Sequence, residues 1–231
     1  MTAAKTSDAA PAPTTLSEDE LSSSAQRERR KRILDATLAL ASKGGYDAVQ
    51  MRAVAKKADV ALGTLYRYFP SKVHLLVAGL VSQFERAGER IGKVQIPGDT
   101  AAERLMFVLD RNTEALQRAP LLTEAMLRAF MFADATVANE VEEVGFLMDR
   151  IIARALAQGE PDELQLSIAR VVSDVWMSNL VSWLTRRSSA ADVATRLALT
   201  IDLLLGTDDS PRRARLRRRV ALLEGLPAAE Q

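Results

Sequence analysis

The sequence predicts an all-α protein, and three features of its 231 residues lead to that fold class. Apolar residues recur at helical spacing along most of the chain, and no stretch sustains the apolar–polar alternation that is typical of strands. The stretch Val49–Phe69 reads as two short helices separated by a tight turn at Asp59 and Val60. Cysteine is absent, which excludes disulfides and zinc–thiolate sites. We therefore expect a fold built from helix packing, with a helix-turn-helix unit near its N-terminal end.

The second short helix of this unit, Ala61–Phe69, has one face to bury and one to expose. Leu65 and Phe69 lie four residues apart and are expected to pack against the first helix. The remaining side chains of this helix suit a DNA major groove. Gly63 has no side chain, so a phosphate or base edge can approach the backbone there. Ser71 is a natural N-cap for the next helix, whose start suits a phosphate. An ordinary helical hairpin with aromatic packing is the alternative. The DNA contacts expected here are Gly63 by close approach, Thr64 to a base edge, Arg67 to guanine or phosphate, and Tyr66, Tyr68 and Lys72 to phosphates.

The net charge of +1 hides a strong asymmetry along the chain. Residues 25–72 hold eleven Lys and Arg against four Asp and Glu, a local charge of +7. Residues 73–210 hold thirteen against twenty, a local charge of −7. The asymmetry directs a polyanion such as nucleic acid to the N-terminal module.

At these residues the chain resembles a known family. The motif GTLYRYFPSK, preceded by MRAVAKKADVA, is similar to the DNA-binding domain of the tetracycline-repressor (TetR) family, from Ala25 to about Leu80. The resemblance implies phosphate contacts at the start of the preceding helix, which adds Gln50 and Arg52, the latter also a candidate for guanine. The likeness extends to about Leu205 and is to TetR-family repressors of cholesterol-catabolism genes. It rests on the further segments QRERRKRILDATLALASKGGYDAVQMRAVA, PLLTEAM, FADA and ARVVSDVWMSNLVSWLTRR.

Composition and resemblance together divide the chain into four segments. Residues 1–24, rich in Ala, Ser, Thr and Pro, are expected to be disordered. Residues 25–80 form the expected helix-turn-helix domain, and residues 81–206 the effector-binding and dimerisation domain. The family places this boundary inside a long helix, Lys72 to about Gly92, of roughly 30 Å. Residues 207–231 form a basic tail in which Arg212–Arg219 is either a solvated segment or a second nucleic-acid contact.

The body of the chain is expected to bind a large apolar effector. Its flexible Met and flat aromatic side chains suit an elongated apolar pocket, and Asn179 and Asp174 are expected to orient a polar end. Ordinary core packing is the alternative for these residues. The resemblance implies that the effector is a steroid-derived acyl-CoA thioester. The effector-binding candidates are Met106, Leu109, Met126, Phe130, Phe146, Met148, Trp176, Asn179 and Trp183.

A homodimer is expected, because one recognition helix reads only a few base pairs and a palindromic double-stranded operator requires two. The family pairs its last two long helices across the dimer, here Glu163–Arg187 and Ser189–Leu205. Trp183, Leu184 and Leu197 are candidates to anchor that contact, and monomer core is their alternative role.

Other classes of function fit the sequence less well. A helical-bundle enzyme would need clustered titratable groups, but His74 is the one histidine and the Glu-x-x-His signature of di-iron bundles is missing. We expect no catalytic residue, metal or cofactor. A regulator of fatty-acid metabolism that responds to a fatty acyl-CoA, and a DNA-binding protein without an effector, remain alternatives. No membrane-spanning run and no apolar signal segment occur, which favours the cytoplasm.

Overall fold

The computed structural model describes residues 23–157 and 159–206. Within these ranges the chain forms α-helices, one short 3₁₀ helix and no strand, so the all-α prediction is confirmed. The expectations for residues 1–22 and for the arginine-rich tail lie outside the described residues. The elements are α1 (Ser24–Ala48), α2 (Met51–Ala58), α3 (Leu62–Tyr68), α4 (Lys72–Gly92), α5 (Ala101–Gln117), α6 (Pro120–Met131), η1 (Ala135–Val137), α7 (Ala138–Leu156), α8 (Glu163–Leu184) and α9 (Ala190–Leu205).

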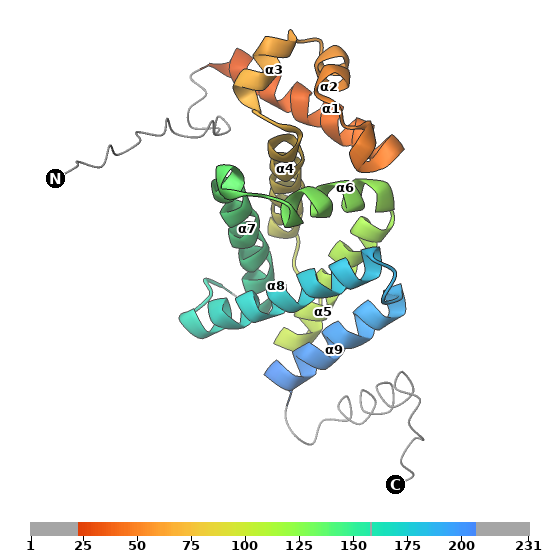
Figure 1. Cartoon of the computed structure of the whole chain (residues 1–231). Coiled ribbons are helices and arrows are strands. Elements are labelled where there is room, and N and C mark those ends of the chain that lie inside the picture. The colour runs from red at the N-terminus through yellow and green to blue at the C-terminus, as the bar shows by residue number, and fades with distance from the viewer. Residues whose placement is uncertain (1–22, 158, 207–231) are drawn as a thin grey trace, which may run out of the picture.

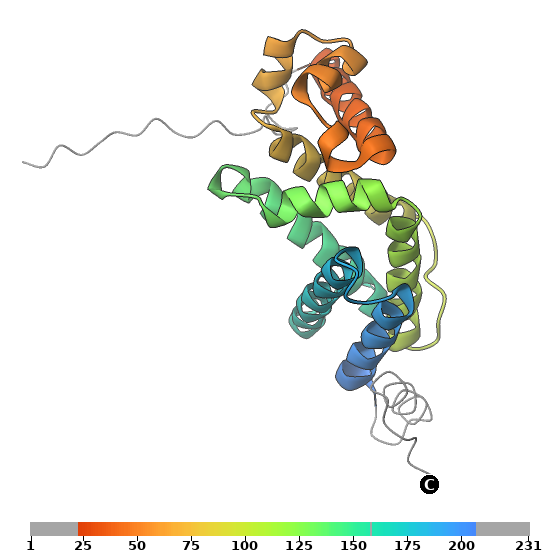
Figure 2. The same ribbon diagram turned by 45° about the vertical axis from the view of Figure 1, so that its right-hand side comes forward.

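The helices form two parts joined by α4 (Figures 1 and 2). Helices α1, α2 and α3 gather at one end, where α2 and α3 form the predicted helix-turn-helix. Helix α4 leads from α3 into the body, where it packs against α6 and α7. Helices α8 and α9 lie at the end far from α3, and α6 passes between α1 and the rest of the body.

Local sequence signals account for most helix boundaries. Ser23, Thr100, Asp162 and Ser189 each form a capping box, in which the cap side chain accepts from the third helical N–H and that residue's side chain reaches back. Ser23 therefore begins α1 inside the segment that was expected to be disordered. Helix α4 has the predicted bounds, and the side chain of its predicted cap, Ser71, accepts from the N–H groups of Val73 and His74.

The glycine pair Gly44 and Gly45 predicts the end of the first helix as a flexible C-cap, but α1 extends past it to Ala48. Gly44 and Gly45 have non-helical backbone angles, and Gly45 has a φ of 65°, a region that glycine enters without steric cost. A further turn through Ala48 follows this kink and carries Tyr46. The glycine pair thus ends the regular helix as predicted, but it also redirects the chain toward α6.

The core confirms the buried face predicted for the recognition helix. Leu65 and Phe69 are both fully buried. Helix α4 approaches α1 closely, since a Cβ added at Gly79 would lie 3.1 Å from Leu38 Cδ2. Leu197 is fully buried in the body and is therefore wrong as a dimer anchor, because α9 turns this side chain toward its own core. No helix in the described ranges is long and apolar enough to cross a membrane.

Tyr68 overturns one prediction for the DNA-binding face. Its side chain is only 1% exposed, with its ring 6.5 Å from that of Phe69. The helical turn between Leu65 and Phe69 rotates position 68 inward, whereas Tyr66 stays 47% exposed. A phosphate contact by the Tyr68 side chain is therefore wrong for this structure.

We predict that Tyr68→Ala lowers the free energy of unfolding by about 3–5 kcal/mol, the usual loss for truncating a buried aromatic side chain. Tyr66→Ala, the matched exposed control, should change it by less than about 0.5 kcal/mol. Urea denaturation followed by circular dichroism measures both. Equal stabilities of the two variants would contradict the buried position of Tyr68.

Candidate DNA-binding and effector-binding sites

The turn between α2 and α3 presents the recognition helix at the surface. Asp59 adopts the left-handed conformation with a φ of 53°, and its N–H donates to the carbonyls that end α2. This C-cap reverses the chain within a few residues, and Ala61 then begins α3. The geometry is that of a helix-turn-helix whose second helix is free to enter a major groove.

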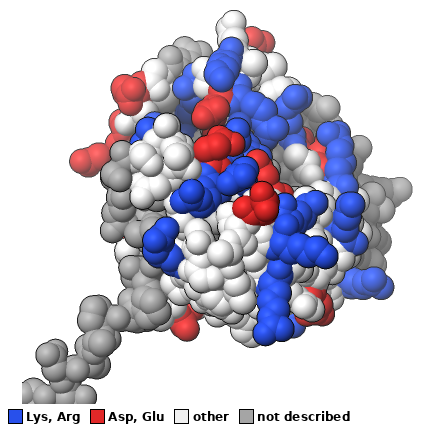
Figure 3. Space-filling model, turned by 90° about the horizontal axis from the view of Figure 1, so that it is seen from above, with Lys and Arg blue, Asp and Glu red and all other residues white. Residues whose placement is uncertain are grey.

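Most of the predicted DNA contacts lie on one exposed end of the molecule. Lys and Arg side chains are spread over this end, with carboxylates among them (Figure 3). A Cβ added at Gly63 would meet no atom within 4 Å, so the protein's own packing does not require glycine there. Gly63 thus leaves room for a group outside the chain. Gln50, Arg52, Gly63, Tyr66 and Arg67 are exposed, and Thr64 and Lys72 are half-buried.

Lys72 is engaged inside the protein. Its Nζ donates to the carbonyl oxygen of Tyr46 at 2.9 Å and lies 3.7 Å from the centroid of the Tyr46 ring. Desolvation lowers the pKa of Lys72, the nearby Asp47 carboxylate acts in the opposite direction, and the Arg128 cation lowers it further. Its phosphate contact stays a prediction, in which the ammonium serves the protein and the DNA together.

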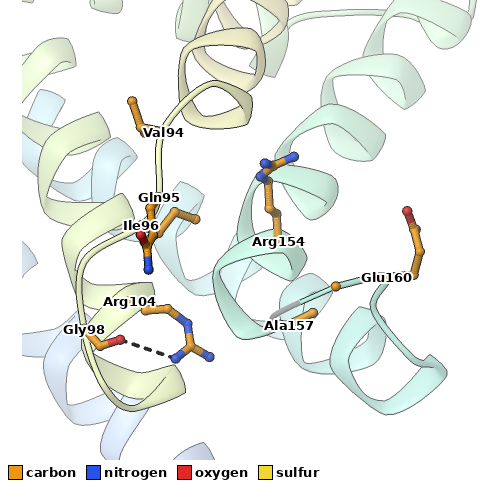
Figure 4. A pocket seen from close by; sticks show the side chains of 9 residues that line it. Val94, Gln95, Ile96, Gly98, Arg104, Arg154, Ala157 and Glu160 are labelled. Carbon is orange, nitrogen blue, oxygen red and sulfur yellow. Dashed lines mark hydrogen bonds between the residues drawn. The ribbon is translucent and has the colours of Figure 1, made fainter.

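One groove on the described part of the chain contains none of the predicted effector residues. It has a volume of about 780 Å³ and lies between the loop after α4 and the end of α7 (Figure 4). Arg104, 9% exposed, donates from Nε to Ala155 O at 3.0 Å, from Nη2 to Leu156 O at 3.1 Å and from Nη1 to Gly98 O at 3.5 Å. The Arg104 guanidinium thus caps the C-terminal end of α7 and holds the loop after α4 in place. Because its donors already have partners within the protein, we assign this groove a structural role.

An inner cavity of about 150 Å³ lies instead between α4, α5, α6 and α8. Two predicted effector residues, Met126 and Trp176, line it. The Trp176 indole N–H donates to Thr113 Oγ1 at 2.9 Å, and the Phe84 ring meets the indole edge-on at 6.2 Å. Since the one polar atom of Trp176 is satisfied, the cavity wall there is apolar.

An outer cleft between α4 and α5 adjoins the inner cavity. The cleft has a volume of about 660 Å³ and shares Ala87, Arg90, Asn112 and Ala115 with the cavity wall. Arg90, Lys93, Arg111 and Arg118 line the cleft, with Glu114 as their carboxylate neighbour. Arg118 pairs with Glu114 at 2.8 Å. We call the inner cavity and the adjoining cleft together the passage. It has an apolar interior and a cationic mouth.

Several predicted effector residues lie elsewhere. Phe146 is 59% exposed and Asp174 is also exposed, so neither faces a buried ligand site, because their helices turn them outward. Asn179 is buried, but its amide donates to Val175 O within its own helix. Trp183 lines a shallow site with Arg186 and Arg187 at the end of α8. Met106, Leu109, Phe130 and Met148 belong to or pack against the core and do not line the inner cavity.

The sequence reasoning missed most of the cavity wall. Leu80, Phe84 and Ala87 recur at helical spacing on α4, a pattern that by itself predicts only the buried face of a helix. The signal that could have identified them is the pairing of such a stripe with polar and charged neighbours one turn further on, Arg90 on α4 and Asn112 on α5. The missed lining residues are Leu80, Gln83, Phe84, Ala87, Arg90, Asn112, Ala115, Leu116, Ala119, Leu122 and Thr123.

Comparison with known proteins assigns the family. Residues 33–78 match the family described as bacterial regulatory proteins, tetR family, and residues 98–204 match the tetracyclin repressor-like C-terminal domain. The chain therefore belongs to the tetR family of bacterial regulatory proteins. Within it, the chain is a KstR-like transcriptional repressor. It is 69% identical over 192 residues to the HTH-type transcriptional repressor KstR of Rhodococcus jostii (strain RHA1), covering 83% of this chain and 90% of that protein.

Solved structures share the fold. A TetR transcriptional regulator from Rhodococcus sp. RHA1 is 35% identical, with a TM-score of 0.72 over 80% of this chain and 100% of that chain. Thermus thermophilus FadR, a TetR-family repressor solved in complex with lauroyl-CoA, is 22% identical, with a TM-score of 0.61 over 79% of this chain and 97% of that chain. At this identity the second likeness concerns the fold alone.

We predict that Arg67→Ala weakens operator binding by about tenfold or more, since an arginine contact to DNA is worth roughly 1–3 kcal/mol. If Arg67 contacts phosphate, the salt slope should also fall by about one. Lys93→Ala removes a cation at the far end of α4 and serves as the control. Titration of labelled operator at several salt concentrations measures both variants, and an Arg67→Ala protein indistinguishable from the control would exclude Arg67 from the interface.

Proposed function

We propose that this protein is a homodimeric repressor that binds a palindromic operator and leaves it when a steroid-derived acyl-CoA enters the passage between α4, α5 and α6. The observation that carries the effector proposal is an apolar cavity that shares wall residues with a cleft lined by cations. An acyl-CoA has the same division, an apolar acyl part and a head that carries phosphates. Arginine is well suited to phosphate because its guanidinium donates several hydrogen bonds in fixed directions.

The size of the inner cavity supplies a mechanism for release. Pockets for small molecules usually measure about 300–1,000 Å³, whereas the inner cavity has only about 150 Å³. A steroid ring system must therefore widen the space between α4 and α6. Because α4 starts directly after the recognition helix, such a shift changes the spacing of the two recognition helices in a dimer. The effector needs only to favour the widened state, and about 1.4 kcal/mol of differential affinity gives each tenfold change in operator binding.

Control of cholesterol or steroid catabolism genes is supported by the resemblance of the chain to repressors of those genes. A fatty acyl-CoA is the second candidate effector, because a narrow cavity suits an extended acyl chain and the same fold is found with lauroyl-CoA in the Thermus protein. In that case the protein would regulate fatty-acid metabolism.

The contacts proposed for the operator are Gln50, Arg52, Gly63, Thr64, Tyr66, Arg67 and Lys72, without Tyr68. For the effector they are Met126 and Trp176, to which we add Phe84, Arg90 and the rest of the cavity wall.

The dimer proposal rests on apolar surface that α8 and α9 leave uncovered. Leu164 and Val171, 68% and 48% exposed, lie two turns apart on one side of α8. On α9, Leu203 is 60% exposed. Large apolar side chains exposed on the last two helices are available to pack against a second copy of the chain. We therefore keep the pairing of α8 and α9 across a homodimer.

We predict that a steroid acyl-CoA such as cholestenoyl-CoA releases the protein from operator DNA in a fluorescence-anisotropy assay. Free cholesterol, without phosphates, should not do so at the same concentration. Release by stearoyl-CoA but not by the steroid thioester would move the protein to the fatty-acid class. No release by any of them would contradict the proposed effector.

Arg90→Ala should weaken cholestenoyl-CoA binding by about 3–10-fold, since hydrogen bonds to a charged group are worth roughly 1.5–3 kcal/mol and solvent screens part of this at an open mouth. The free cholestenoic acid should bind as it does to the unmodified protein. Arg86→Ala, one turn earlier on α4 and directed at Asp35 of α1, is the matched control. Fluorescence of Trp176 in the cavity wall reports binding, and equal losses in both variants would remove Arg90 from the mouth.

In sedimentation at micromolar concentration the protein should have a mass near twice 25.2 kDa. Leu203→Glu places a charge in the proposed interface and should shift the protein toward the monomer. Phe146→Glu changes an equally exposed side chain on α7 and should leave the dimer intact. A monomeric unmodified protein would contradict the palindromic operator as well as the interface.

A further inference from the structure

Helix α6 lines the inner cavity with one set of side chains and contacts α1 with another. Leu122, Thr123 and Met126 line the inner cavity. Leu121 and Glu124 lie on the side toward α1, where a Cβ added at Gly45 would lie 3.8 Å from Leu121 Cδ2 and 3.4 Å from Glu124 Oε2. Figures 1 and 2 both show α6 between the end of α1 and the rest of the body. A ligand that displaces α6 therefore pushes on an element in contact with the DNA-binding domain.

Tyr46 occupies this contact. Two cations lie over its ring, Lys72 Nζ at 3.7 Å and Arg128 Cζ at 4.4 Å from the centroid. Lys72 is the first residue of α4, and Arg128 stands one turn from the C-terminal end of α6. A single side chain of α1 thus contacts α4 and α6, two of the four helices that line the cavity. Cation–π contacts depend on distance and on the ring face, so they hold the three helices at a set separation.

The backbone around Tyr46 holds its side chain between α4 and α6. The kink at Gly44 and Gly45 turns the end of α1 toward α6, and the left-handed conformation of Gly45 would strain other residues. Lys72 also donates to the Tyr46 carbonyl oxygen at 2.9 Å, which fixes the backbone as well as the ring.

A second contact joins α4 to η1, the short helix that follows the C-terminal end of α6. His74 of α4 is 3% exposed, and its Nε2 donates to Thr136 O in η1 at 3.2 Å. A carbonyl only accepts, so in a neutral ring Nδ1 accepts from the Ser71 hydroxyl at 2.9 Å. The start of α4 is therefore tied to α6 through Tyr46 and Arg128, and to η1 through His74.

We propose that Tyr46 is a positioning residue through which α6 sets the orientation of the DNA-binding helices. Its ring, held by Lys72 and Arg128, keeps α1 to α3 in the operator-competent arrangement while the inner cavity is empty. When an acyl-CoA displaces α6, the same ring transmits the movement to the start of α4 and to α3. This inference rests on the proposed function for its effector half, and on geometry alone for its operator half.

The test compares Tyr46→Leu, which removes the ring, with Tyr46→Phe, which keeps it. Circular dichroism first establishes that both variants are folded. Without effector, Tyr46→Leu should bind operator about fivefold more weakly than the unmodified protein, and Tyr46→Phe within twofold of it. With saturating cholestenoyl-CoA or stearoyl-CoA, the change in operator affinity should be at least about fivefold smaller for Tyr46→Leu. Trp176 fluorescence should show unchanged acyl-CoA binding in both variants.

A Tyr46→Leu protein with normal operator affinity and a full effector response would overturn the proposal, as would a Tyr46→Phe protein that loses as much as Tyr46→Leu. If no acyl-CoA affects the unmodified protein, the proposed function fails, and the effector-free affinities alone decide the role of Tyr46. Arg128→Met and its control Arg128→Lys give an independent comparison should Tyr46→Leu not fold. Arg128→Met should reproduce the Tyr46→Leu result, and equal behaviour of the two Arg128 variants would count against the proposal.

Discussion

The burial of α4 connects the two parts of this protein. From His74 to Val81 every residue of the helix is buried, so α4 has no solvent-facing side over two turns. A helix that is buried all round cannot rotate or slide without disturbing the elements packed on it. On one side it contacts α1, closely enough that Gly79 leaves no room for a side chain beside Leu38 without displacing it. Further along, Phe84, Ala87 and Arg90 of the same helix face the proposed effector site.

This arrangement gives a physical reason for coupling between two distant sites. The recognition helix ends at Tyr68, and α4 begins only a few residues later. Buried Tyr68 and Phe69 anchor that junction in the core of the DNA-binding domain. The ligand need not contact α3, because a displacement of α4 or α6 is carried through packed side chains. A coupling free energy between sites requires only that the effector and the operator prefer different arrangements of the same helices.

The sequence predicted the elements better than the sites. Capping residues such as Ser71 and Thr100, and breakers such as Pro120 and the glycine pair, act over a few residues, so helix limits can be read locally. The rotation of a short helix is harder to predict, and Tyr68 shows why. In a helix of seven residues, the direction of the Tyr68 side chain depends on how Leu65 and Phe69 pack in the core. The sequence pattern does not distinguish a buried from an exposed tyrosine at this position.

Only a few of the side chains predicted for an effector pocket line the proposed site. Met126 and Trp176 line the cavity, whereas Phe146 lies on the surface. Composition identifies side chains suited to a pocket, but a cavity forms where several helices fail to close on one another. That depends on contacts between residues far apart in sequence, such as Phe84 with Trp176 and Trp176 with Thr113. The cationic mouth was missed for the same reason, because Arg90 and Arg111 line one cleft only once the fold brings α4 and α5 to its two sides.

In the proposed mechanism, occupation of the cavity changes the distance between the two recognition helices of a dimer. Because the chain has no cysteine, a single Ala61→Cys substitution at the exposed start of α3 places one spin label on each recognition helix. Pulsed electron paramagnetic resonance then measures the distance between the labels with and without saturating cholestenoyl-CoA. The distance distribution should shift when the thioester is bound at the concentration that releases operator DNA. An unchanged distribution under conditions where the DNA is released would contradict the proposed mechanism.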